Sequence, residues 1–149
     1  MCSTRSAYAA PPSLTDFSFT FPPEPQWVRS AREAVRAALA PTAPGGADLV
    51  EIATLLTSEL VTNAFVASVH SVAPAPIALH AEWTRRGAVR VLVHDRAPGT
   101  PLVPDHLPDA DDEGGRGLLL LTLHATEWGV CHHAPGPGKL VWFTLGDKP

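Results

Sequence analysis

The sequence predicts an α/β (α+β) two-layer sandwich in which a mixed, mostly antiparallel sheet is covered on one face by about three helices. The 149-residue chain has the length of a single domain. Its apolar periodicity changes along the chain in the order strand, helix, helix, two strands, long loop, helix and two strands. This order lacks a regular strand–helix–strand alternation, which argues against a parallel Rossmann-type sheet.

The first elements follow a short N-terminal segment. Residues 1–15 are small, polar and proline-containing, so we expect disorder there and a single domain over residues 16–149. Residues 17–21 alternate aromatic and polar side chains, which predicts a strand with one buried face. Residues 24–40 predict an amphipathic helix. Its apolar side consists of Trp27, Ala31, Ala34, Val35 and Ala38.

The rest of the chain predicts two helices and four strands. The helices are residues 47–71 and 115–126, and the strands are residues 77–84, 88–94, 127–132 and 139–145. Residues 85–87 would close a hairpin between the second and third strands. The acidic, proline-rich segment 97–114 is long for a connecting loop, so it is either functional or disordered.

Composition excludes several classes of function. The formal net charge of −4 gives no electrostatic support for direct nucleic-acid binding. We see no apolar run of the length needed to span a membrane, and we expect no membrane association. The two cysteines cannot form a disulfide framework, which favours a reducing, cytoplasmic compartment.

Glu59 and Asn63 are the most informative residues of the chain. In the helix 47–71 they lie one turn apart, on the side of four apolar residues. Those residues are Ile52, Leu55, Leu56 and Val66. A carboxylate and a carboxamide in an apolar stripe are costly to bury without partners. Either this face meets a polar ligand, or protein groups alone satisfy the pair.

Two further polar features each have two interpretations. Asp95 follows an apolar strand, where it is either a turn former or an acceptor for an amino group in a pocket beside the sheet. Gly115, Arg116 and Gly117 precede a leucine-rich helix. Glycines at a helix start let backbone N–H groups approach an anion, although ordinary turns use glycine as well.

A basic ridge lies on the helix 24–40. Arg29, Arg32 and Arg36 stand opposite its apolar side. The ridge is either a solvated face or a docking surface for an acidic partner protein.

Taken together, these motifs resemble the GHKL, or Bergerat-fold, ATPases, and within them the anti-sigma-factor serine kinases. The resemblance covers about residues 17–145. It rests on residues 58–64 (SELVTNA), Asp95, residues 113–118 (EGGRGL), residues 128–130 (WGV) and residues 138–143 (GKLVWF), in that order.

The resemblance implies a role for each matching residue. Asn63 would coordinate Mg²⁺ on the phosphates of ATP, and Glu59 would be the general base. Asp95 would bind the exocyclic amino group of adenine. The motif formed by Gly115, Arg116 and Gly117 would hold the phosphates, and the loop 97–114 would be the nucleotide lid.

The resemblance also implies a function. The expected protein is an ATP-dependent serine/threonine kinase that phosphorylates a small antagonist protein and sequesters a sigma factor, with a homodimer as one expected state. The alternative is a weak or inactive nucleotide-binding module that regulates by partner binding alone.

Three departures from the family pattern stand out. Residues 65–67 lack the arginine or histidine that often follows the Asn63 turn. Ala97 replaces a glycine, and Lys139 replaces a threonine. The first departure bears on catalytic rate, and the Ala97 departure bears on adenine binding.

Overall fold

Five strands form a single antiparallel sheet in the order β1-β2-β3-β5-β4 in the computed structural model. The structure describes residues 17–39, 46–71, 74–84, 86–97, 116–132 and 138–146. The strands are β1 (Phe17–Phe21), β2 (Ile77–Trp83), β3 (Val89–Asp95), β4 (Glu127–His132) and β5 (Lys139–Leu145). Every neighbouring pair of strands is antiparallel, which confirms the predicted sandwich with a simpler sheet than a mixed one.

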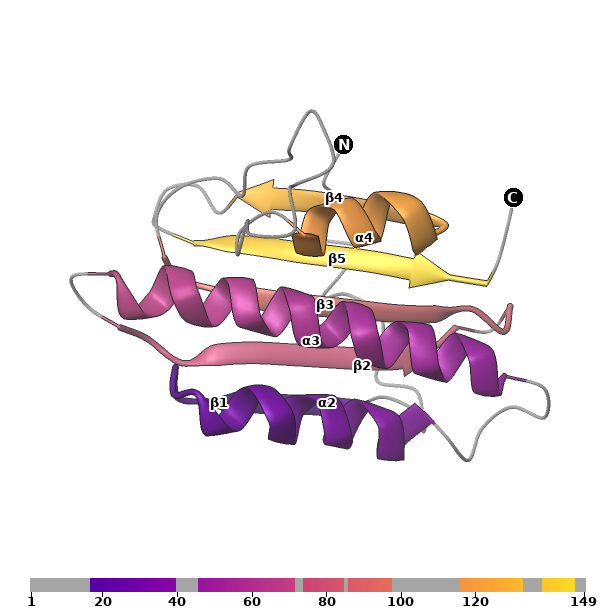
Figure 1. The fold of residues 1–149 in the computed structure, drawn as a ribbon, viewed down its shortest axis with the longest axis horizontal. Helices are drawn as coiled ribbons and strands as arrows, with labels where there is room; N and C mark the ends of the chain where they lie inside the picture. The colour runs from indigo at the N-terminus through magenta and orange to yellow at the C-terminus, as the bar shows by residue number, and fades with distance from the viewer. Residues whose placement is uncertain are drawn as a thin grey trace.

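Three helices cover one face of this sheet (Figure 1). They are α2 (Gln26–Leu39), α3 (Ala47–Val69) and α4 (Arg116–His124). The central helix α3 contacts α2, α4 and strands β2, β3 and β5. Each helix is shorter than predicted by a few residues at one or both ends, because periodicity locates a helix better than its ends.

Side chains alternate along each strand between the helix-covered face and the opposite face. In β3, Val89, Val91 and Val93 are buried toward the helices, while Arg90 is partly exposed. Phe143 and Val141 of β5 follow the same phase and join the main core. Since successive strand residues point to opposite faces, Asp95 and Lys139 also face the helices.

The buried face of α3 differs from the predicted apolar stripe. Leu55 and Val66 are 44% and 46% exposed, whereas Leu56 is fully buried. The other buried residues of α3 are Val50, Ala53, Thr54, Thr57, Leu60, Val61, Ala64 and Ser68. The expectation that Leu55 and Val66 share one buried stripe with Leu56 is therefore wrong. The helix is apolar on most sides, so its periodicity does not single out the face that packs.

Helix α3 is an apolar run long enough to span a membrane, so the expectation that the chain has no such run is wrong. By length and composition alone it could cross a membrane. In this fold it packs against the sheet and two helices, and the core helix of a soluble domain passes the same test. This packing accounts for the buried apolar residues of α3, whereas Leu55, Val66 and Val69 are exposed.

Leu56→Ala should lower the free energy of unfolding by about 2 to 5 kcal/mol, because it leaves a cavity in the core. The matched control Leu55→Ala, one residue away, should cost about 1 kcal/mol or less, because that side chain is already largely in water. Urea denaturation of both variants measures the difference. Equal costs would contradict the orientation of α3.

Candidate functional site

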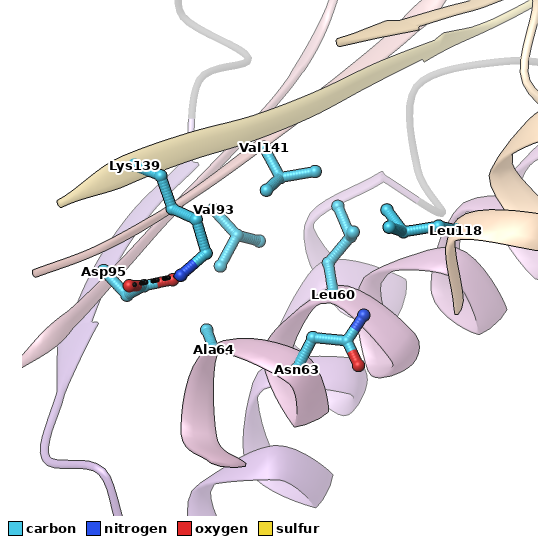
Figure 2. Close-up of a pocket in the computed structure, with 8 residues that line it drawn as sticks. All are labelled: Leu60, Asn63, Ala64, Val93, Asp95, Leu118, Lys139 and Val141. Carbon is cyan, nitrogen blue, oxygen red and sulfur yellow. Dashed lines mark hydrogen bonds and ion pairs between the residues drawn. The ribbon is translucent and has the colours of Figure 1, made fainter. Parts of the chain in front are cut away.

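A pocket opens between α3, the start of α4 and the helix-covered side of β3 and β5 (Figure 2). Its lining residues are Leu60, Asn63, Ala64, Val93, Asp95, Leu118, Lys139 and Val141. Five of these are apolar, and the polar ones lie at two ends. Figure 2 shows the Asn63 amide beside Leu60 and Leu118, whereas Asp95 and Lys139 meet at the other end.

Asp95 is the last residue of β3, and its carboxylate is almost completely buried. Its Oδ1 accepts a hydrogen bond of 2.9 Å from the backbone N–H of Ala97. An aspartate that bonds the backbone two residues further on holds its own turn, as one of the two sequence interpretations supposes. The carboxylate also lines the pocket, as the other interpretation requires, but its use as an acceptor for an amino group of a ligand stays a prediction.

Lys139 forms a buried ion pair with this carboxylate. Its Nζ lies 3.0 Å from Asp95 Oδ1, and the residue is only 5% exposed. The two residues are direct cross-strand partners at the end of the β3–β5 ladder. Removing one partner of a buried pair typically costs about 3 to 5 kcal/mol, because the other charge is left uncompensated. Asp95 is therefore already bonded to a cation.

Glu59 and Asn63 lie half-buried on the side of α3 that faces α4. A Cβ placed on Gly117 would come within 2.9 Å of Asn63 Nδ2 and 3.1 Å of Glu59 Cβ. The second residue of α4 therefore sits directly against the Glu59–Asn63 turn. A larger residue at this point would require the Asn63 amide or the Glu59 side chain to shift.

The structure brings together four of the predicted site residues: Gly117 lies against Glu59 and Asn63, and Asp95 lies at the far end of the pocket. Arg116 begins α4. Gly115 and nearly all of the predicted lid, residues 98–114, lie outside the described residues. The role of Lys139 as partner of Asp95 is the feature that sequence reasoning missed.

The basic ridge lies on α2. Arg29 pairs with Glu33 one turn later at 3.1 Å, and Arg36 pairs with Glu51 of α3 at 3.3 Å. These ion pairs are exposed and contribute little to stability. Arg32 is partly buried, which weakens the description of the three arginines as one solvated row. Their use as a docking surface stays a prediction.

The donor groups of the pocket favour a hard cation only at the Asn63 end. Within the part of the chain that the structure describes, no group of three His, Cys, Asp or Glu side chains could hold a metal ion by itself. A carboxamide oxygen is a suitable single ligand for Mg²⁺, which commonly keeps several waters and takes further oxygens from a phosphate substrate.

Such a sandwich, with an Asn-bearing central helix and a strand-end aspartate at one pocket, is the arrangement that the resemblance to the ATPases implies. The family of the histidine kinase-like ATPase domain matches residues 21–145. The chain therefore belongs to this family, the GHKL ATPases, and membership implies nucleotide binding. No match was found among curated proteins.

The fold is also similar to a solved structure. The crystal structure of the RsbU and RsbW domains of Rv1364c from Mycobacterium tuberculosis superposes with a TM-score of 0.63 at 22% sequence identity. The match covers 91% of this chain and 33% of the other, so this chain spans about a third of that protein. At this identity the likeness establishes the fold, which is the one the family resemblance implied.

Gly117→Ala should lower the free energy of unfolding by about 1 kcal/mol. Overpacking typically costs about 1 to 3 kcal/mol, while alanine gains up to about 1 kcal/mol of helix propensity over glycine. Urea denaturation checks the net sign. Leu123→Ala, on the exposed side of the same helix, is the control and should change stability by about 0.5 kcal/mol or less. A net stabilisation by Gly117→Ala would show that the Asn63 side chain moves aside without lowering the free energy of unfolding.

Proposed function

We propose that this domain binds Mg²⁺ and ATP and acts as a serine/threonine protein kinase in a regulatory switch. It would transfer the γ-phosphate to a small antagonist protein and sequester a sigma factor. The observation that supports this most directly is the contact of Gly117 with Glu59 and Asn63, because it puts a carboxylate, a carboxamide and a helix start at one place.

This end of the pocket fits a phosphate chain and its cation. The side-chain oxygen of Asn63 is a ligand of the type that Mg²⁺ prefers. The first backbone N–H groups of α4 have no partner within the helix, and they favour an anion together with the helix dipole. Bound Mg²⁺ neutralises the negative charge that hinders attack on the γ-phosphate.

Glu59 would act on the acceptor hydroxyl. Its carboxylate takes the proton as the hydroxyl oxygen forms a bond to the γ-phosphorus, and the bond between that phosphorus and the bridging oxygen of ADP breaks. The products are a phosphorylated serine or threonine, ADP and a protonated Glu59. Positioning and charge neutralisation provide most of the acceleration in such reactions, so one base and one metal ligand are a sufficient minimum.

A second candidate function is favoured by the other end of the pocket. Asp95 is bonded to Lys139 there. No arginine or histidine lies in residues 65–67 beside the Asn63 turn. A module that regulates by binding a partner, with little or no phosphoryl transfer, is compatible with both observations.

The proposed setting is the cytoplasm, with protein partners. The solved structure of similar fold carries RsbU and RsbW domains in one protein. A sigma factor and an antagonist protein are the proposed partners here, without direct contact to nucleic acid, and a homodimer is the proposed assembly.

Asn63→Ala should weaken Mg²⁺–ATP binding by at least about tenfold, because the loss of one charge-assisted contact is worth about 1.5 to 3 kcal/mol. Isothermal titration calorimetry measures the affinity. Val66→Ala, one turn further along α3 and exposed, is the control that should bind like the wild type. If the two variants bind equally well, Asn63 is not a metal ligand.

Glu59→Gln should reduce transfer of labelled phosphate to the antagonist protein by about 10² to 10⁴-fold, which is the usual contribution of a general base. Nucleotide affinity should change little, because the amide retains the shape of the side chain. Glu51→Gln, on the exposed side of α3, should transfer normally. Undiminished transfer by Glu59→Gln would mean that another group is the base. If the wild type transfers no phosphate at all, the partner-binding module is favoured.

A further inference from the structure

The Asp95–Lys139 pair occupies the part of the pocket where the family resemblance implies the base of the nucleotide. Both side chains point from the ends of β3 and β5 toward α3, and Figure 2 shows the Lys139 ammonium beside the Asp95 carboxylate, joined to it by a dashed line. An exocyclic amino group would reach Asp95 as an N–H donor. The ammonium of Lys139 is already such a donor, held at 3.0 Å.

A neutral amino group is a poor competitor for this position. A hydrogen bond to the Asp95 carboxylate is charge-assisted whether the donor is an amino group or an ammonium, but only the ammonium also brings the opposite charge. A base that displaced Lys139 would also leave an ammonium that is 5% exposed in an apolar surrounding of Ala64, Val93 and Val141. Lys139 therefore holds one oxygen of the carboxylate, Oδ1, which also accepts the Ala97 N–H.

The burial of the pair adds to this. Asp95 is 1% exposed and Lys139 is 5% exposed. A base that entered beside Asp95 would have to displace Lys139 or approach the second carboxylate oxygen, and displacement would separate two buried opposite charges.

We infer that Lys139 is a built-in occupant of the base pocket, so that this domain recognises a nucleoside triphosphate by its phosphates and with little selection of the base. The inference rests on the proposed function, because it assigns binding to the Asn63 and Gly117 end. It goes beyond that function in making Lys139 the residue that determines specificity. ATP and GTP then bind alike.

The test compares ATP and GTP, each with Mg²⁺, by calorimetry on the wild type and on Lys139→Thr. In the wild type the two affinities should agree within about threefold, less than the value of one hydrogen bond to a charged group. Lys139→Thr frees the carboxylate and enlarges the pocket. The affinity of the Lys139→Thr variant for ATP should rise by about tenfold or more, while its affinity for GTP stays the same. Lys139→Arg retains a cation opposite Asp95 and should show no gain.

Each outcome has a distinct meaning. A wild type that prefers ATP over GTP by about tenfold overturns the inference and leaves the proposed function intact. Binding of ATP by Lys139→Thr alone overturns the proposed function of the wild type but supports Lys139 as the occupant. Absence of binding in both proteins overturns both proposals. If thermal melting shows that Lys139→Thr is unfolded, the ratio of affinities in the wild type and the Lys139→Arg variant decides.

Discussion

The contact between Gly117 and the Glu59–Asn63 turn determines the shape of the site. It brings the start of α4 within contact distance of α3, so the end of one helix that has N–H groups without intrahelical partners lies beside the polar turn of the other. Because α4 lies this close to α3, Leu118 lines one wall of the pocket, opposite Val93 and Val141 of the sheet. A side chain at position 117 would move this wall and the polar groups together.

Much of the fold was predictable because short runs rich in β-branched and aromatic residues, bounded by turn residues, indicate strands. The strands Phe17–Phe21, Glu127–His132 and Lys139–Leu145 have the predicted bounds. The helix ends and the buried face of α3 were predicted less well. That helix is covered by the sheet and by two other helices, so apolar residues occur around most of its circumference, and sequence pattern cannot tell Leu56 from Leu55.

The candidate site, like the fold, was predictable only in part. The one-turn spacing of Glu59 and Asn63 is a local property of a helix, and the sequence contains it in full. The Asp95–Lys139 pair joins residues 44 positions apart and depends on the register of two strands. A signal for it did exist, since Lys139 has the phase of the core residues Val141 and Phe143. A lysine in that phase needs a buried partner, because buried lysines are almost always paired.

The position of Lys139 has an evolutionary consequence. Codons for lysine and threonine differ by a single base, so a lineage can exchange the occupied pocket for an open one in one mutational step. The lysine already lies opposite Asp95 in the ladder, so the exchange requires no change of backbone. On the inference above, relatives that differ at this position alone would differ in how strongly they select the base of the nucleotide.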